Sequence, residues 1–319
     1  MRVGLFTDAF THLSLSETLA WCAEHGIDSV ELGTGGYSPV PHVNLEALCA
    51  DGSARQDLIA EIDDHGLTLG ALNVSGNPLH PDRSLGSRHD AALRSTLLLA
   101  AELGVTRVVA MSGCPGGPGD GGWPVFAGGA WLPDMEGLWD WQWQERISPY
   151  WLELSRWARA SAPDVRICLE LHPGTSIYNA ESFHALREVA EDNVMVNLDP
   201  SHFWWQGMDP VKVIGELSGC IGWSHGKDTF IHQARMAVTG SLDFRWPREA
   251  GAMPWYFCAV GAGHPVGDWT ALIKALHGAG HEHTISIEHE DPGLSPEDGV
   301  LASLRGLRQA LSALSALET

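Results

Sequence analysis

Hydrophobic and polar positions alternate between two patterns along the chain. Short apolar runs rich in Val, Ile and Leu recur, and each is followed by a small or polar cluster, which is typical of buried strands. The runs predict strands over residues 3–8, 29–36, 67–76, 106–113, 166–174, 194–202, 220–228 and 283–291. The intervening segments have helical periodicity, and several end at a glycine that can terminate a helix. They predict helices over Ser16–His25, Ala54–His65, Asp90–Leu103, Tyr150–Ala160, Ala180–Ala190, Pro210–Leu217, Trp269–His277 and Pro296–Leu314.

The alternation of strand and helix predicts a parallel sheet covered by helices. Near-continuous apolar strands are buried on both faces, as such a sheet requires. Eight successive units predict an α/β fold of the (β/α)8 TIM-barrel type, with residues 1–319 forming one domain. A doubly wound open sheet is the alternative, which the lack of a GxGxxG motif after the first strand disfavours.

Two connections are longer than ordinary loops between a strand and a helix. They span residues 114–145, after the fourth strand, and 229–268, after the seventh. Connections of this length are usually functional or disordered, and we expect both to be lid-like insertions. The first is rich in Gly and Pro but carries too much aromatic surface for a solvated linker, which indicates a lid or a flap that faces a partner. Its tryptophans are Trp123, Trp131, Trp139, Trp141 and Trp143.

Composition and charge narrow the classes of protein. The formal net charge is −21 and no Lys/Arg cluster stands out, so we expect no nucleic-acid partner. No apolar stretch approaches the roughly 20 residues of a membrane span, and no basic leader opens the chain. These features predict a cytoplasmic protein without membrane association. The six cysteines form no CxxC pair, which argues against disulfides and cysteine-zinc sites.

Polar residues end the last four predicted strands. Glu170, Asp199, His225 and Glu288 each close an apolar run. In a barrel the carboxyl ends of the strands converge on one mouth, so these side chains are expected to meet. Burying them without a partner would be costly, and one divalent cation would satisfy all four. The oxygen-rich set favours Mn²⁺, with Mg²⁺, Co²⁺, Fe²⁺ or Zn²⁺ as alternatives. Glu290 replaces Glu288 as a ligand if the strand register differs by two residues.

Several motifs resemble one family of enzymes. VELGTGG, ELHPG, LDPSHFWWQGMDP, SHGKDT and SIEHEDP occur in this order. Together they resemble the xylose isomerase-like TIM-barrel superfamily of sugar (phosphate) isomerases and epimerases. The resemblance implies that the four strand-end residues hold the metal and that His202 and Lys227 face the substrate. The segment WYFCAVGAGH at 255–264 resembles the larger members, which act on 3-keto glycosides.

Isomerising or epimerising a sugar requires removing and returning a proton next to a carbonyl. We expect a metal-stabilised enediolate, with Glu170 and Glu288 as base and acid on opposite faces of one carbon. His172 lies two residues beyond Glu170 and is a further candidate proton carrier. His264 and Trp204 are expected to contact the substrate from loops at the mouth.

Three functions are compatible with these residues. The first is a metal-dependent isomerase or epimerase of a sugar or sugar derivative. The second is a metal-dependent lyase that cleaves a 3-keto C- or O-glycoside, because the same enolate expels a leaving group β to the abstracted proton. The third is a non-catalytic binding or scaffold protein that docks a partner through its tryptophan-rich segment. The assembly is left open between a homo-oligomer and a complex with a small partner subunit.

Overall fold

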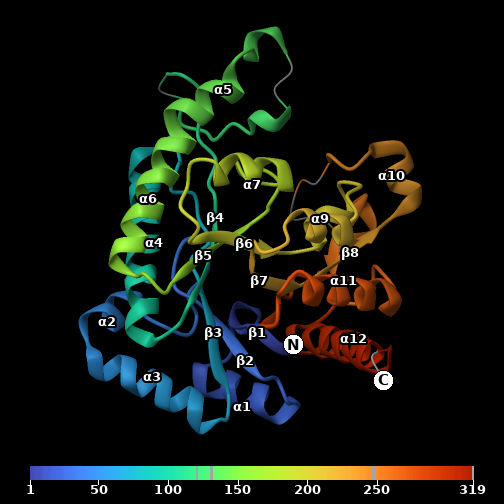
Figure 1. Cartoon of the computed structure of the whole chain (residues 1–319). Coiled ribbons are helices and arrows are strands. Elements are labelled where there is room, and N and C mark those ends of the chain that lie inside the picture. Colours follow the sequence, from blue (N-terminus) through green and yellow to red (C-terminus); the bar gives the residue numbers. More distant parts are fainter. Residues whose placement is uncertain (120, 130–131, 244, 246–248, 318–319) are drawn as a thin grey trace.

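A closed parallel barrel forms the centre of the molecule (Figure 1). The computed structural model describes residues 1–119, 121–129, 132–243, 245 and 249–317. Within these ranges eight strands pair in the order β1–β10–β7–β6–β5–β4–β3–β2. They are β1 (Arg2–Phe6), β2 (Ser29–Gly33), β3 (Thr68–Asn73), β4 (Arg107–Met111), β5 (Arg166–Glu170), β6 (Val194–Leu198), β7 (Ile221–Gly226) and β10 (Thr284–Ile287). Each corresponds to one predicted strand, so the predicted (β/α)8 barrel is confirmed.

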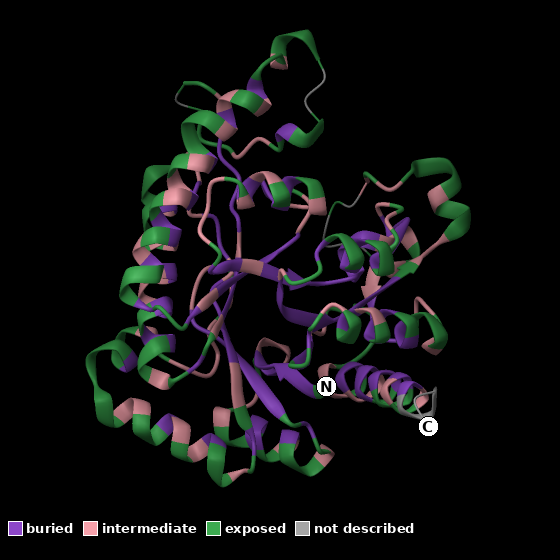
Figure 2. Cartoon of the chain, in the orientation of Figure 1, coloured by how far each residue is buried: buried purple, intermediate pink, exposed green. Residues whose placement is uncertain are grey.

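One tryptophan fills much of the barrel interior below the mouth. Trp223 of β7 is 2% exposed and packs with Ala71, Val109 and Cys168. Its ring occupies space that other strands leave empty, because a Cβ on Gly70 would lie only 2.7 Å from Trp223 Cη2. Figure 2 shows the strands mostly buried and the helices exposed along their outer faces. The interior is therefore a packed core that closes the barrel beneath the strand ends.

Helices surround the barrel, and local capping sets their ends. They are α1 (Leu15–His25), α2 (Leu45–Ala50), α3 (Gly52–Asp64), α4 (Arg83–Leu103), α6 (Ser148–Ser161), α7 (Ala180–Arg187), α8 (Ser201–Trp204), α9 (Pro210–Glu216), α11 (Val266–Gly278) and α12 (Pro296–Leu317). Helix α4 begins at Arg83 rather than at the predicted Asp90, because Asp82 caps it by accepting the N–H groups of Ser84 and Leu85. Over the described ranges, none of the helices has both the length and the apolarity needed to cross a membrane.

The two insertions contain more regular structure than the sequence indicated. In the first, α5 (Leu138–Gln142) runs through a π-helical turn, Trp143–Ile147, directly into α6, and the segment projects from the barrel (Figure 1). The second contains α10 (Gln233–Thr239) and an antiparallel pair, β8 (Asp228–Ile231) with β9 (Trp255–Cys258). The sequence predicted 229–268 as a lid-like insertion but did not predict strands within it, because β8 follows β7 so closely that the predicted strand over 220–228 already includes its first residue. Trp131 lies outside the described residues.

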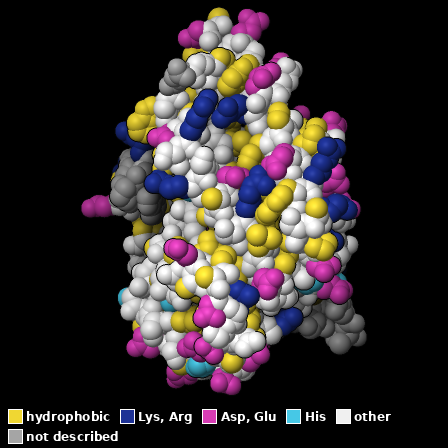
Figure 3. Space-filling model, turned by 90° about the vertical axis from the view of Figure 1, so that its left-hand side faces the viewer, with side chains coloured by type: hydrophobic (Ala, Val, Ile, Leu, Met, Phe, Trp, Pro, Cys, Tyr) yellow, Lys and Arg dark blue, Asp and Glu magenta, His cyan; other side chains and the backbone are white. Residues whose placement is uncertain are grey.

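Charged side chains on the face of α2, α3, α4 and α6 are of both signs. Figure 3 shows Lys and Arg interspersed with Asp and Glu on this side. Arg94 lies 3.0 Å from Asp90 Oδ2 and also pairs with Glu153. Arg156 and Arg159 pair with Glu191 in the same way. Acidic neighbours thus neutralise these arginines locally.

Candidate metal centre

The four residues predicted to hold a metal form one cluster at the carboxyl ends of the strands. Glu170 ends β5, Asp199 directly follows β6, His225 lies in β7, and Glu288 directly follows β10. Each offers one ligand atom, and all these atoms lie within 4.8 Å of one another. Asp199 and His225 are buried, Glu170 is 3% exposed, and the Glu288 side chain is 15% exposed. The spacing is short enough for a single ion to contact all four.

Two properties of the cluster fit a divalent cation. Its three carboxylates bring negative charge together, and one carboxylate oxygen lacks a well-formed hydrogen bond. Asp199 Oδ2 is buried without a well-formed hydrogen bond, although Lys227 Nζ lies 3.1 Å away. Three carboxylates gathered in a water-poor site repel one another unless positive charge is supplied. Glu170, Asp199 and Glu288 could each give an oxygen to the ion, and His225 could give a ring nitrogen.

The ammonium group of Lys227 places positive charge next to the carboxylates of the cluster. Its Nζ lies 2.6 Å from Glu288 Oε2 and 3.1 Å from Glu290 Oε2, and the side chain is 2% exposed. Burial lowers the pKa of this ammonium, but the carboxylates of Asp199, Glu288 and Glu290 outweigh burial and raise the pKa well above its ordinary value. Burial raises the pKa of Glu288, yet Lys227 and His225 together hold that pKa well below its usual range. Lys227 and Glu288 therefore remain an ion pair across the neutral pH range.

Glu31 fixes the orientation of His225 from beneath the cluster. His225 Nε2 lies 3.1 and 3.2 Å from the two Glu31 oxygens, while His225 Nδ1 lies 3.1 Å from Glu288 Oε2. Glu31 is fully buried and accepts further hydrogen bonds from Trp223 Nε1 and Asn73 Nδ2, both at 2.8 Å. Burial lowers the pKa of His225, but the carboxylates of Glu31 and Glu288 on its two sides outweigh burial and raise that pKa well above its ordinary value. A metal ion that takes Nδ1 would displace the hydrogen there, while Nε2 keeps its hydrogen towards Glu31, which can only accept. A glutamate inside the apolar run VELG was the sequence signal for this residue.

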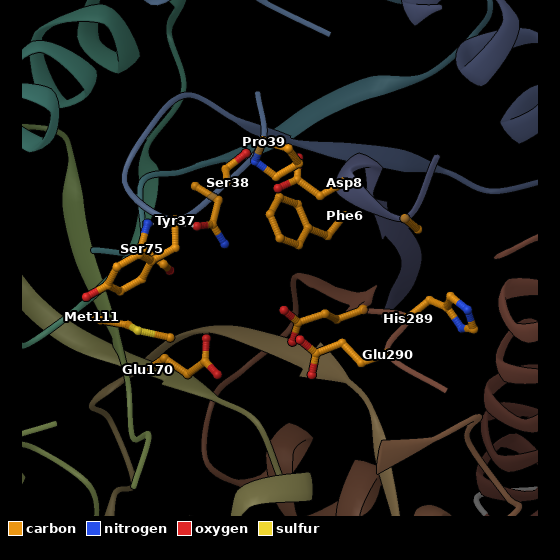
Figure 4. A pocket seen from close by; sticks show the side chains of 13 residues that line it. Phe6, Asp8, Tyr37, Ser38, Pro39, Ser75, Met111, Glu170, His289 and Glu290 are labelled. Carbon is orange, nitrogen blue, oxygen red and sulfur yellow. Dashed lines mark hydrogen bonds between the residues drawn. The ribbon is translucent and has the colours of Figure 1, made fainter. Parts of the chain in front are cut away.

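A polar cavity of about 270 Å³ opens above the cluster. Glu170, Glu288 and Glu290 line it, together with Asp8, Tyr37 and Ser38 from the segments after β1 and β2. Asp8 and Ser38 face Glu170 and Glu290 across the opening, so charged and hydroxyl groups converge from both sides (Figure 4). The sequence analysis missed Asp8, Tyr37 and Ser38. The polar TD that ends the run VGLFTD was the one signal for Asp8.

Comparisons with known proteins agree with this architecture. The family described as xylose isomerase-like TIM barrel matches residues 19–310. The chain belongs to this family. The uncharacterized protein YfiH of Bacillus subtilis is 36% identical over 315 residues, which are 98% of this chain and 100% of YfiH.

Two solved structures share the fold across almost their whole length. The crystal structure of the IolI protein with a bound zinc atom is 20% identical, with a TM-score of 0.67, and the match covers 98% of this chain and 99% of IolI. The E. coli 3-keto-D-glucoside 4-epimerase YcjR is 15% identical, with a TM-score of 0.64, and the match covers 97% of this chain and 99% of YcjR. At identities this low, the two matches show that the chain shares the fold of these structures.

Two predicted histidines lie beside Glu170 in this xylose isomerase-like barrel. His202 Nε2 is 2.7 Å from Glu170 Oε1 and 3.3 Å from Asp199 Oδ2. The His172 ring lies 4.2 Å from the His202 ring, and His172 Nδ1 donates to the Pro173 carbonyl at 2.7 Å. Burial lowers the pKa of each imidazole to about 4, so both are neutral near pH 7. His172 Nε2 is consequently the nitrogen that can accept a proton.

Trp204 and His264, the other two residues expected to contact the substrate, do not line the cavity above the cluster. Their rings stack on each other at 3.9 Å, and His264 Nδ1 bonds Asp228 Oδ1 at 2.7 Å. Trp204 lines a separate surface hollow beside Met208 and Leu272. Among the described residues that line the cavity above the cluster, neither of the two occurs. The structure therefore favours a structural role for both side chains over the predicted contact with substrate.

Replacing Glu31 by glutamine is expected to weaken metal binding by about 10- to 100-fold, because the residue behind a ligating histidine sets its tautomer and basicity. The amide can present its N–H₂ to His225 Nε2 and allow the proton to move to Nδ1. Calorimetric titration of chelator-treated protein with Mn²⁺ measures the effect. Glu24→Gln, on the exposed face of α1, is the control and should bind as the wild type does. An unchanged affinity in Glu31→Gln contradicts the orienting role.

Asp8→Asn is expected to stabilise the metal-free protein at pH 8 by about 1–2 kcal/mol. Burial raises the pKa of Asp8 to about 6, with Glu31 and Glu288 adding to the rise and Ser38 opposing it. The folded state binds this proton more tightly than the unfolded state, so stability is lost as pH rises from about 4 through about 6. The full shift corresponds to about 3 kcal/mol, reduced here for partial exposure. Urea unfolding at pH 4 and pH 8 tests this: the two proteins should differ only at the higher pH, and an equal difference at both excludes titration of Asp8 as the cause.

Proposed function

We propose that the chain is a divalent-metal-dependent isomerase or epimerase that moves a proton on a carbon next to the carbonyl of a sugar or keto sugar. The observation that carries the proposal is that Glu170 and Glu288 line one cavity from β5 and β10 while each also offers an oxygen to the metal cluster. The zinc atom bound by IolI supports the metal, and the 3-keto-D-glucoside 4-epimerase YcjR supports the reaction class. The oxygen-rich ligand set favours Mn²⁺ as the natural ion.

The side chains divide the work of such a reaction. A bound divalent ion would polarise the sugar carbonyl and a neighbouring hydroxyl. Glu170 and Glu288 are the proton acceptor and donor, reaching the carbon from two walls of the cavity. Lys227, charged and in contact with Glu288, favours the negative charge that develops on the substrate oxygen. His202 contacts Glu170 and can exchange a proton with it, with His172 behind it as a further acceptor.

Deuterium exchange tests this function directly. Chelator-treated protein reloaded with Mn²⁺ is incubated in D₂O with ketohexoses and with 3-keto-glucosides. The expected result is deuterium at the carbon next to the carbonyl, with the carbon skeleton intact and with loss of exchange when the metal is withheld. Protein that holds no stoichiometric metal and exchanges no substrate proton would instead agree with a non-catalytic scaffold role.

A lyase acting on 3-keto glycosides is the second candidate. It is favoured by a second cavity, lined by aromatic side chains, that adjoins His202 and offers room beyond a single sugar ring. In a lyase, the electrons freed by proton removal would expel the group attached β to that carbon, which would leave with its bonding pair and a proton. The same incubation separates the candidates, because the lyase releases free aglycone and the epimerase does not.

A further inference from the structure

A second cavity, of about 120 Å³, lies behind the contact between Glu170 and His202. Its lining includes His172, His202, Trp205, Met253, Trp255 and Phe257. His202 is its nearest link to the cluster, because His202 Nε2 lies 2.7 Å from Glu170 Oε1, and Glu170 lines the polar cavity. The contact between His202 and Glu170 thus separates the polar cavity at the cluster from a neighbouring apolar one.

The walls of the apolar cavity are already packed against one another. The second insertion supplies Trp255 and Phe257 from β9, and Met253 just before that strand. Trp255 stacks on Trp205 at 4.4 Å with the rings 7° from parallel, and the rings of Phe257 and His202 form a T-shaped pair with centroids 5.3 Å apart. Met253, Trp205 and Trp255 are each less than a tenth exposed. Rigid aromatic walls of this kind bind a flat apolar group at little cost in conformational entropy.

We propose that this cavity is the subsite for an aromatic ring carried by the substrate, so that the substrate is an aryl derivative of a sugar. The inference rests on the proposed function, since it places the sugar in the polar cavity at the cluster. An apolar cavity of about 150 Å³ is known to hold benzene, so 120 Å³ beside a flexible methionine suits one six-membered ring. The aromatic walls made by Trp205, Trp255 and Phe257 favour an aromatic ring over an alkyl chain.

Binding experiments without turnover test the subsite. The Mn²⁺-loaded full chain is titrated calorimetrically with phenol, phenyl β-D-glucoside and methyl β-D-glucoside. Phenyl glucoside is expected to bind at least about tenfold more tightly than methyl glucoside. Met253→Trp fills the cavity and should remove this preference. Phe257→Ala enlarges the cavity and should shift the preference towards 2-naphthyl β-D-glucoside, which covers the case in which Met253→Trp does not fold.

A control variant and separate outcomes distinguish failure of the subsite from failure of the proposed epimerase function. Leu242→Trp adds the same bulk at a position that is 82% exposed on the same insertion, and it should leave the preference unchanged. Phenyl glucoside and phenol that bind no more tightly than methyl glucoside overturn the proposal, as does a phenyl preference that both cavity variants leave intact. If the phenyl preference follows the variants but no substrate proton exchanges, the subsite stands and the epimerase function fails.

Discussion

Glu288→Gln is expected to lower the rate of substrate proton exchange by at least about a thousandfold while the barrel remains folded. The amide has nearly the same shape but neither carries a negative charge nor accepts a proton at neutral pH. It removes one metal ligand and one proton carrier together, and loss of general acid–base catalysis alone costs about 10²- to 10⁴-fold. Lys227 Nζ, 2.6 Å from Glu288 Oε2, loses its shortest ion pair. Exchange rate, metal content and thermal unfolding are measured on one preparation.

Glu290→Gln is the matched control. Glu290 also contacts Lys227, at 3.1 Å, but its side chain is 45% exposed and it is not part of the four-residue cluster. Its loss should reduce exchange by less than about tenfold. A Glu288→Gln protein with wild-type exchange contradicts the proposed chemistry. A larger loss in Glu290→Gln would show that Glu290, two residues further along, is the ligand in the working enzyme.

The barrel could be predicted because its strands are buried on both faces. Such strands appear as apolar runs such as RICLEL and VMVNLD, and each ends at a polar residue where the chain reaches the mouth. The short strands β8 and β9 could not be found in this way. Phe230 and Tyr256, paired across them, are partly exposed, so their pattern depends on the surface that the insertion covers.

The metal cluster could also be predicted, because its residues lie at strand ends. Many of the residues around it could not. Glu170 and Glu288 occupy strand ends, and the geometry of a barrel brings such ends together whatever the loops do. Asp8 and Ser38 reach the cavity from irregular segments, whose course depends on contacts distant in sequence. His264 shows the limit of this reasoning: it lies in a loop at the mouth, but its ring bonds Asp228 and stacks on Trp204, and it does not line the cavity above the cluster.

Asp228→Ala is expected to lower the free energy of unfolding by about 3–5 kcal/mol, the largest loss of stability that we foresee for one substitution. Asp228 is fully buried directly after Lys227 and organises the turn Gly261–His264. Its oxygens accept the backbone N–H groups of Thr229, Gly261, Gly263 and His264, the His264 ring N–H and the Trp269 indole N–H. Alanine leaves these donors buried without an acceptor.

The turn cannot easily rearrange to supply another acceptor. Gly261 has φ +91°, and a Cβ on Gly263 would lie 2.1 Å from the Thr229 carbonyl oxygen, so this backbone is held against β8. Asp209→Ala is the matched control, because Asp209 also accepts two backbone N–H groups, at the start of α9, but its side chain is 51% exposed. Loss of such a cap costs about 1 kcal/mol. Chemical unfolding of both variants measures the difference. A cost for Asp228→Ala no greater than that for Asp209→Ala would mean that water reaches the turn, and the carboxylate would then not be what holds the insertion against the metal centre.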